Sequence, residues 1–404
     1  MFKLFPIKNG LENVPGFFCD AVNVGMRTDP ANSGDNSAVD GDVAFIRSDT
    51  LCAIAAVFTA NRFRAAPIQH YLRYPEGFRS NFLLINAKNA NAMTGEKGIE
   101  DIDMLFAELG KRISLTNPVM SSTGVIGYRL DREKIGSAFD RFDYHARESG
   151  KTARAIMTTD SFKKELCYRV ELENGEAFHI AAICKGAGMI NPAMATMLCF
   201  VVTDAAIPSG EMQPMLQRAA ANSFNRISVD GDTSTNDTLM LLSNGESGVY
   251  EQEAFRSALE KITFEMAMMI LKDGEGANKL IAFEVKGAQS DREAERAARA
   301  LSNSLLVKTA LFGEDPNWGR IASTIGASGI ECDDSRLTIH YDDLLIYSDA
   351  FRELDREREE KAYKIMKQES FRVTCDLGMG DGSFTAYGCD LSYDYVKINA
   401  EYRT

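Results

Sequence analysis

A threonine among small residues is the strongest candidate for chemistry in this chain. The segment Lys185–Leu198 reads Lys-Gly-Ala-Gly-Met-Ile-Asn-Pro-Ala-Met-Ala-Thr-Met-Leu and contains Thr196. A threonine hydroxyl is a weak nucleophile unless a base lies beside it. When threonine is the first residue of a chain, its own α-amine can be that base, since the amine has a pKa of about 7.7–8.0. Thr196 can use this chemistry only after its bond to Ala195 is cut.

The Thr196 hydroxyl could also cut that bond. Attack of its Oγ on the carbonyl carbon of Ala195 would give an ester that water then opens. The products would be an α chain, 1–195, and a β chain, 196–404, that begins with the nucleophile. The alternative is a glycine-containing turn between two buried strands, in which Thr196 is only a residue of high strand propensity. The residue types by themselves favour that alternative.

A second segment could stabilise the charge that such chemistry creates. Val119–Gly127 reads Val-Met-Ser-Ser-Thr-Gly-Val-Ile-Gly. A Ser/Thr/Gly turn after a strand exposes backbone N–H groups, and a threonine hydroxyl adds another donor. Donors of this kind stabilise the oxyanion of an acyl transfer. The same residues are common in ordinary loops, so a plain turn is the alternative.

Three other segments carry candidate binding groups. Lys185, beside a glycine-rich stretch, could bind a substrate carboxylate, although a lone lysine is usually a solvated surface group. Thr158 in Ile-Met-Thr-Thr-Asp could contact a substrate, although helix caps and turns are commoner uses of threonine. The three aspartates between residues 230 and 237 do not fit the EF-hand pattern, so no individual role follows for them.

Strands and turns must position these groups. Two runs of strand-forming residues, Phe178–Cys184 and Met197–Thr203, flank the central segment. Cys167–Leu172 and Phe178–Cys184 form a predicted hairpin around Asn174-Gly175, a dipeptide typical of tight turns. This hairpin would deliver Lys185 to the central segment.

Strands and helices alternate along the rest of the chain, which predicts an α/β fold. Further helices are expected at 99–113, 131–137, 144–155, 212–223, 251–271, 291–311 and 351–368. Further strands are expected at 43–46, 52–58, from 82 into an Asn/Gly-rich loop, and at 239–242, 279–285, 336–341 and 344–347. Residues 371–377 and 383–389 are expected to pair across a Gly-Met-Gly-Asp-Gly turn, and the C-terminus is interpreted as a tail.

Composition and charge exclude several classes of function. A chain of 404 residues with 45% hydrophobic residues can bury an ample core in one large unit or two domains. The net charge of −13 argues against a nucleic-acid surface. The four histidines lack metal-ligand spacing, so we expect no metal site. Eight scattered cysteines indicate free thiols in a reducing compartment, and no run has transmembrane length, so we expect a cytoplasmic protein without a membrane partner.

The central segment resembles the self-cleavage segment of the ornithine acetyltransferase family, also called glutamate N-acetyltransferase. The matching pattern is Lys-Gly-Ala-Gly-Met-Ile-x-Pro-x-Met-Ala-Thr-Met-Leu. Ser-Thr-Gly-Val-Ile-Gly around Thr123 matches without a break, and the match runs along nearly the whole chain. In that family the bond before the threonine is cut, and the new N-terminal threonine carries the acetyl group. The resemblance implies the family's fold, in which the two fragments fold together.

The resemblance also implies roles for individual residues. Thr123 and Gly124 would be the oxyanion-hole pair. The block around Trp318 would be a structured loop near the site. The family usually has glycine where Lys88 stands and more often threonine where Asn278 stands. The implied substrate contacts are Thr158, Lys185, Thr196, Glu275, Asn399 and Thr404.

The implied reaction is a ping-pong acetyl transfer from N-acetylornithine to glutamate through acetyl-Thr196, without a cofactor. Some family members also accept acetyl-CoA to make N-acetylglutamate, and an α2β2 assembly is implied. One alternative is an amidase or aminopeptidase, in which water resolves the acyl-enzyme. The other is a non-catalytic protein that binds a nucleotide or metabolite through its glycine loops.

Overall fold

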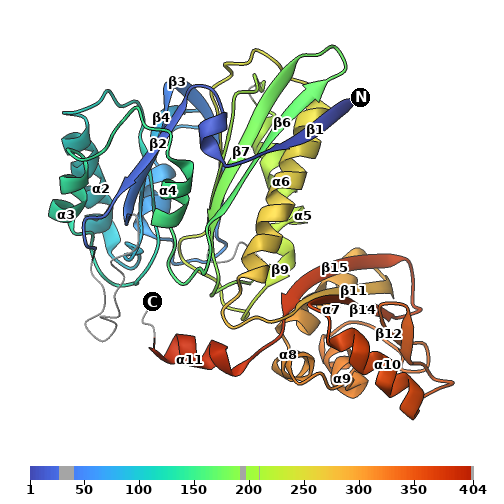
Figure 1. Cartoon of the computed structure of the whole chain (residues 1–404). Helices are drawn as coiled ribbons and strands as arrows, with labels where there is room; N and C mark the ends of the chain where they lie inside the picture. Colours follow the sequence, from blue (N-terminus) through green and yellow to red (C-terminus); the bar gives the residue numbers. More distant parts are fainter. Residues whose placement is uncertain (27–40, 192–196, 209, 402–404) are drawn as a thin grey trace.

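The protein is built around two β-sheets, each with its own helices (Figure 1). The computed structural model describes residues 1–26, 41–191, 197–208 and 210–401. Ala195, Thr196 and Thr404 therefore lie outside the described residues. Strands and helices alternate along the chain, which confirms the predicted α/β class.

The first sheet has nine strands within the described ranges, in the order β1-β6-β7-β8-β10-β3-β4-β5, with β2 paired to β3. Its parallel pairs are β8 with β10 and β4 with β5. The strands are β1 (Phe2–Ile7), β2 (Phe17–Val22), β3 (Val43–Phe58), β4 (Arg79–Asn86), β5 (Val119–Ser122), β6 (Lys164–Leu172), β7 (Ala177–Lys185), β8 (Leu198–Thr203) and β10 (Thr238–Ser243). Because β8 and β10 follow Thr196 in sequence, the predicted α and β chains would share this sheet.

The second sheet has the order β13-β12-β14-β11-β15-β9 in the described part of the chain. Its strands are β9 (Ile227–Ser228), β11 (Leu280–Ala288), β12 (Thr338–Tyr341), β13 (Leu344–Tyr347), β14 (Ser370–Asp376) and β15 (Gly382–Cys389).

The predicted hairpin before the central segment is confirmed. β6 and β7 are antiparallel, and Gly175 in their turn has a φ of +84°, a conformation that glycine adopts at little cost. β8 then runs antiparallel to β7, with Leu198 opposite Lys185. The chain therefore leaves the sheet and re-enters it at neighbouring positions.

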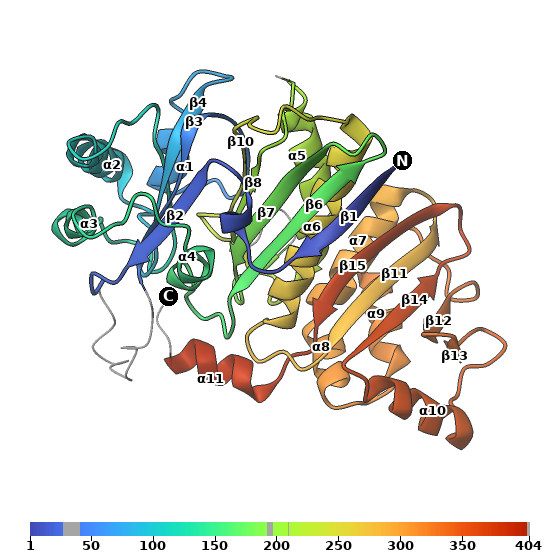
Figure 2. The same ribbon diagram turned by 45° about the horizontal axis from the view of Figure 1, so that its top comes forward.

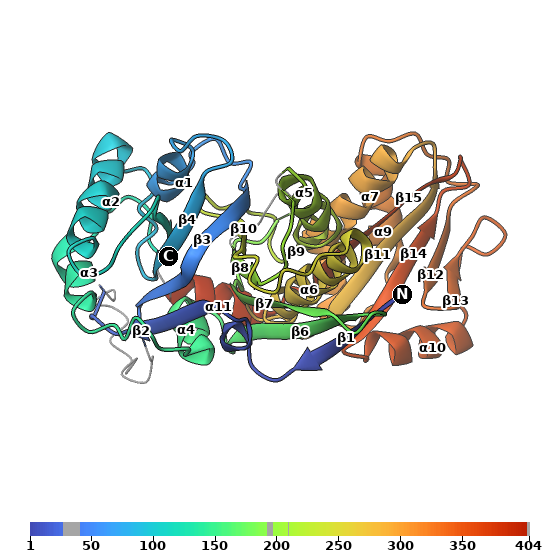
Figure 3. The ribbon, with the colours of Figure 1, turned by 90° about the horizontal axis from the view of Figure 1, so that it is seen from above.

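Helices cover both sheets (Figure 3). Side chains alternate across β6, β7, β8 and β10, so α5 and α6 bury one face of these strands while α4 packs on the other. Helices α7 to α10 bury the second sheet. No helix in the described ranges is both long and apolar enough to cross a bilayer. The helices are α1 (Ala66–Tyr71), α2 (Gly95–Leu109), α3 (Arg132–Ala138), α4 (Ser149–Ala155), α5 (Met212–Asn222), α6 (Gln252–Lys272), α7 (Asp291–Asn303), α8 (Leu305–Phe312), α9 (Trp318–Ala327), α10 (Arg356–Met366) and α11 (Tyr393–Glu401), with 3-10 turns η1 (Leu11–Asn13) and η3 (Phe224–Arg226).

Two predicted boundaries are wrong for local reasons. β3 is one long strand instead of two, because a register shift between Arg47 and Cys52 accommodates the exposed residues between the predicted pieces. The predicted helix 291–311 is two helices, since Ser304 has an extended backbone and its hydroxyl accepts the N–H of Val307 to cap α8.

The predicted pairing of residues 371–377 with 383–389 is also wrong. β11 lies between β14 and β15, parallel to β14 and antiparallel to β15. The connecting loop passes around the end of β11, where the N–H groups of Met379 and Gly380 both donate to Gly287 O. The sequence of these two strands and their loop does not show that a strand from elsewhere in the chain lies between them.

The expected C-terminal tail contains a helix, α11. After β15 the chain leaves the second sheet, and α11 runs back toward the first sheet (Figures 1 and 2). Ser392 Oγ donates to Gly276 O at 2.6 Å and so fastens the start of α11 to the loop that follows α6. This loop and α11 bring residues from the end of the chain to the site described next.

Candidate active site

One pocket collects every described residue that the sequence singled out for chemistry. The residues come from the end of β5, the loop before β6, the end of β7, the loop after α6, and α11, which are far apart in sequence. They are Thr123, Gly124, Thr158, Lys185, Glu275 and Asn399.

Thr123 and Gly124 present two available donors. The backbone N–H of Thr123 is occupied, because it donates to Asn86 O at 3.0 Å. Its hydroxyl oxygen accepts from Lys185 Nζ at 3.4 Å, which leaves the hydroxyl hydrogen free to donate elsewhere. The N–H of Gly124 donates to no described residue. A hydroxyl and an amide of consecutive residues are thus available to an oxyanion.

Position 124 requires glycine. Its φ is +131°, and a Cβ there would lie 2.2 Å from the backbone carbon of Lys88. Lys88 itself has a φ of +69°, in the left-handed region that favours glycine. The glycine usual at position 88 in the resembled family would therefore be unstrained in this loop.

Lys185 is a buried cation at the pocket wall. It is only 2% exposed, and burial lowers the pKa of its ammonium, while the nearby Asp160 carboxylate acts in the opposite direction. Its Nζ donates to Thr123 Oγ1 and forms no ion pair with a described carboxylate. An ammonium placed in this way can bind the carboxylate of a ligand.

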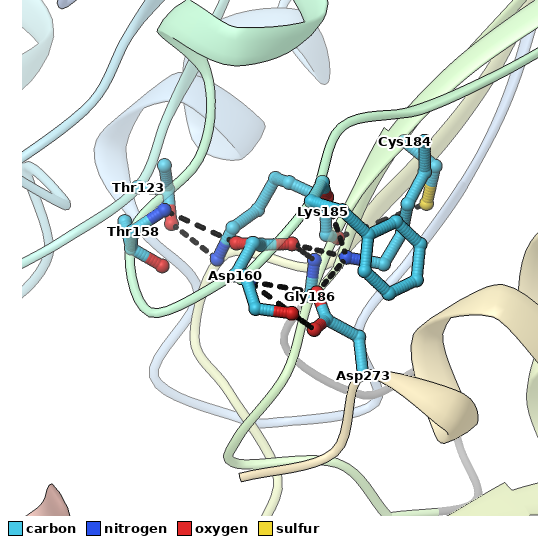
Figure 4. A network of polar contacts seen from close by, with 10 residues as sticks. Thr123, Thr158, Asp160, Cys184, Lys185, Gly186 and Asp273 are labelled. Atoms are coloured by element: carbon cyan, nitrogen blue, oxygen red, sulfur yellow. Dashed lines mark hydrogen bonds and ion pairs between the residues drawn. The ribbon is translucent and has the colours of Figure 1, made fainter. Parts of the chain in front are cut away.

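Asp160 organises the groups around Lys185 (Figure 4). Its Oδ1 accepts from Gly186 N and from Lys164 Nζ, both at 2.7 Å, and its Oδ2 accepts from Thr158 N at 3.1 Å. Burial would raise the pKa of Asp160, but the ammonium groups of Lys185 and Lys164 outweigh it and lower that pKa. One carboxylate therefore fixes the backbone beside two predicted binding residues.

A second carboxylate completes this buried cluster. Lys164 Nζ also donates to Asp273 Oδ2 at 2.5 Å, and the hydroxyl of Ser161 donates to the same carboxylate. The side chains of Lys164 and Asp160 are 0% exposed and that of Asp273 is 3% exposed. The sequence analysis missed all three residues, although Asp160 closes the segment from which Thr158 was chosen.

Glu275 and Asn399 form the opposite wall. Asn399 Nδ2 donates to Glu275 Oε2 at 2.7 Å, so α11 and the loop after α6 meet at the pocket. A Cβ at Gly188 would lie 2.4 Å from the Glu275 carboxylate. Glycine at 188 therefore lets this carboxylate lie against the loop that follows Lys185.

The aspartate-rich segment 228–238 shapes the same pocket. Asp230 accepts from Met189 N at 2.6 Å and from Ile190 N at 2.9 Å. Asn236 Nδ2 donates to Ser122 O at 2.8 Å, immediately before the oxyanion pair. The resemblance implied that this segment shapes the site but gave no individual role to its residues, and the structure supplies those roles.

The block from Phe312 to Ile321 was expected to lie near the site. Phe312 at its start packs edge-to-face against Tyr393 of α11, the helix that lines the pocket, whereas Trp318 lies away from the pocket. Trp318 begins α9, and its ring stacks on Tyr347 with a centroid separation of 4.3 Å. It packs in the core of the second sheet and does not line the pocket. From the sequence, a single tryptophan is equally consistent with a core position and with a binding site, because an aromatic ring can fill either.

A family model and two curated relatives match most or all of this chain, and a solved structure matches half of it. Residues 27–404 match the ArgJ family. The chain is 56% identical to "Arginine biosynthesis bifunctional protein ArgJ" of Wolinella succinogenes over 405 residues, covering 100% of both chains. It is 40% identical to "Glutamate N-acetyltransferase" of Methanopyrus kandleri, covering 90% of this chain and 95% of that protein. The crystal structure of the ArgJ protein of Bacillus halodurans is 38% identical, with a TM-score of 0.47, covering 50% of this chain and 98% of that one.

Proposed function

The chain belongs to the ArgJ family, and from this premise we propose that it transfers an acetyl group from N-acetylornithine to glutamate in arginine biosynthesis. The relatives named for this pathway and for glutamate N-acetylation match at 56% and 40% identity over nearly the full length. The observation that carries the proposal is the gathering of Thr123, Gly124, Lys185 and Glu275 in one pocket.

Thr196 is the proposed nucleophile. The chain first cuts its own Ala195–Thr196 bond, which gives Thr196 a free α-amine as general base. Thr196 Oγ then attacks the acetyl carbonyl carbon, and the amine takes the hydroxyl proton. Collapse of the tetrahedral intermediate breaks the bond between the acetyl carbon and the ornithine nitrogen, which takes the proton back from the Thr196 ammonium, and ornithine leaves. In the second half-reaction glutamate's amine attacks the acetyl carbon, the bond to Oγ breaks, and the proton lost by that amine ends on Oγ.

Thr123 and Gly124 serve as the oxyanion hole. The free hydroxyl hydrogen of Thr123 and the N–H of Gly124 supply two donors to the developing negative charge. The Lys185 ammonium, donating to Thr123 Oγ1, polarises that hydroxyl and strengthens its donation.

One pocket can serve both substrates because both are α-amino acids. We assign Lys185 to the carboxylate that ornithine and glutamate share, and Glu275 to a substrate amine. Thr158, Asn399 and Thr404 are the remaining proposed contacts. Side chains and the new α-amine supply the nucleophile, the base and the hydrogen-bond donors, so the proposal includes no cofactor.

The proposal extends to three further properties. The name of the Wolinella relative includes "bifunctional", which supports acetyl-CoA as a second acetyl donor for glutamate here. Residues on both sides of Thr196 form one sheet, which supports a stable complex of the two fragments and, with the resemblance, an α2β2 assembly. A biosynthetic role and eight free cysteines, seven of them buried, support a cytoplasmic location.

Incubation with N-acetylornithine, with and without glutamate, tests the reaction. We expect N-acetylglutamate and ornithine only when glutamate is present. Free acetate as the main product in both incubations would instead identify an amidase. Replacing N-acetylornithine by acetyl-CoA tests the second donor.

Intact mass tests the nucleophile. The wild-type protein should give two fragments separated between Ala195 and Thr196, whereas Thr196→Ala should give one inactive chain of 404 residues. Cutting that persists in Thr196→Ala would assign the cleavage to an external protease. An uncut, active wild-type protein would contradict the mechanism.

A further inference from the structure

Two aspartates of one segment hold both sides of the stretch in which the proposed cleavage occurs. Asp230 accepts the N–H groups of Met189 and Ile190 on the N-terminal side. Asp237 Oδ1 accepts the N–H of Met197, at 3.1 Å, on the C-terminal side. Met197 is the residue bonded to the carbonyl carbon of Thr196, so its amide is one peptide unit from the proposed nucleophile.

Asp237 is unusual among the carboxyl groups of the described chain. It is 0% exposed, and its second oxygen, Oδ2, has no hydrogen-bond partner among the described residues. Burial raises the pKa of this carboxyl well above its ordinary value, although the Met197 N–H and the more distant Lys185 ammonium act against that shift. The hydroxyls of Ser234 and Thr59 also lower this pKa, but the Met197 N–H is the group to which the carboxyl is joined by a hydrogen bond on the cleavage side. A buried polar atom without a partner calls for an explanation, and the Met197 contact suggests one.

We propose that Asp237 is a positioning residue for self-cleavage, acting through its hydrogen bond to Met197. The inference deepens the proposed function and rests on it. In the cleavage step the bond between Ala195 C and Thr196 N breaks, a bond between Ala195 C and Thr196 Oγ forms, and the hydroxyl proton ends on the nitrogen. Water then cleaves the ester, and Asp237 is unchanged.

Geometry explains why this step needs a fixed backbone. The hydroxyl attacks the carbonyl of its own preceding peptide bond, so the attack distance depends on backbone torsions at the cleavage site. Asp230 and Asp237, both in the segment 228–238, hold the described residues on either side of the cleavage site, namely Met189 and Ile190 before it and Met197 after it. Asn236 of the same segment donates to Ser122 O, the residue before the oxyanion pair. The segment therefore also positions that pair relative to the residues on either side of the cleavage site.

The test compares side chains that keep or remove the acceptor for Met197 N–H. Asp237→Asn keeps a carbonyl oxygen in place, whereas Asp237→Ala removes it and Asp237→Leu removes it while conserving the volume. Cleavage is followed by intact mass after rapid purification. We expect the Ala and Leu variants to cut about 100-fold more slowly, the loss typical of a small misplacement, and the Asn variant to cut within about threefold of the wild type.

Asp204→Ala is the matched control, because it removes a buried carboxylate acceptor as Asp237→Ala does. Asp204 follows β8 at the end opposite Met197, is 2% exposed, and also accepts a backbone N–H, from His179 at 2.6 Å. Its variant should lose stability in the same way yet cut at the wild-type rate. Circular dichroism identifies folded variants, and the Leu variant carries the test if the Ala variant does not fold.

The outcomes separate this inference from the proposed function. A folded Asp237→Ala or Asp237→Leu chain that cuts at the wild-type rate would overturn the inference, as would an Asn variant as slow as Ala. Slow cutting in Asp204→Ala would mean that the loss comes from general destabilisation, and it would also overturn the inference. An uncut wild-type chain would overturn the proposed function itself.

Discussion

The pocket beside the first sheet and helix α10 of the second sheet differ in how far their ion pairs are buried. Around the pocket of the first sheet, Asp160, Lys164 and Asp273 form ion pairs whose side chains are at most 3% exposed. On α10 of the second sheet, Lys361 and Glu357 pair across one helical turn with 56% and 79% of their side chains exposed. Lys308 is the main buried cation beside the second sheet in the described chain, and its Nζ donates to the backbone oxygen of Cys389.

The difference in burial distinguishes exposed charges, which keep the protein soluble, from buried charges, which position the residues of a site. Burying an ion pair costs more desolvation energy than an exposed pair does, and its attraction often only offsets that cost. A fold has little reason to bury a cluster unless the groups are needed there, and clusters with shifted pKa values gather at functional sites. The cluster around Asp160 is buried and the pKa of Asp160 is shifted. Its carboxylate is also needed there, because it holds the backbone beside Thr158 and Lys185.

The largest expected effect comes from removing the cation at the centre of the buried cluster. Lys164→Met leaves Asp160 and Asp273 buried without their shared ammonium, which should lower the free energy of unfolding by about 3–5 kcal/mol. Urea unfolding in the Thr196→Ala background measures this on a chain that is expected to stay uncut. A loss below about 1 kcal/mol, as for an exposed pair, would remove the distinction between the two regions.

The next effect concerns catalysis. Thr123→Val deletes one oxyanion donor and should lower kcat by about 100- to 1,000-fold in the purified, processed fragments. The matched control is Thr374→Val in the second sheet, where a buried threonine donates to Glu284 Oε2 at 2.9 Å. That variant should keep the wild-type kcat. Equal losses in both variants would mean that hydroxyl deletion acts through stability.

The pH dependence of stability should distinguish the two regions further. Burial raises the pKa of Asp230 to about 6, even though backbone N–H groups of Asp232 and Met189 lower it. The folded protein then binds the proton more tightly than the unfolded chain, where the pKa is about 3.9. The stabilising contribution is therefore full below pH 4 and is lost as the pH rises through 6.

Asp230→Asn should remove that dependence. The urea midpoint of the Thr196→Ala chain should fall between pH 4 and pH 6.5 by more than that of the same chain carrying Asp230→Asn. The same comparison for Asp355→Asn, an exposed cap of α10, should give no difference of this sign. Parallel pH profiles with and without Asp230 would contradict the raised pKa.

The smallest effect is expected on α10. Lys361→Met breaks the exposed pair with Glu357, and the urea midpoint should not change measurably because solvent and salt screen such pairs. A shift as large as that of Lys164→Met would show that exposure does not separate the two kinds of ion pair.

Much of the local structure was predictable because it depends on near neighbours. The β6–β7 hairpin follows from two strand-forming runs around Asn174-Gly175, and α6 from a long amphipathic pattern. The pairing of β14 with β15 was predicted wrongly, because the intervening strand, β11, comes from about 90 positions earlier in the chain. Strand order depends on how distant parts of the chain pack together, and the pattern of apolar residues within one strand does not contain that information.

The sequence by itself determined which residue types could perform acyl transfer and that their segments end strands or form tight loops. Thr123 and Lys185 were identifiable because each stands in or beside a glycine-containing segment, whereas Glu275 followed only from the family resemblance. Only the tertiary structure decided which carboxylates support them. Asp160 and Asp355 are both aspartates just before a regular element, yet the first is fully buried between two ammonium groups and the second is 59% exposed. Their roles differ because burial and neighbouring charge are properties of the packed chain, which brings together residues that are far apart in the sequence.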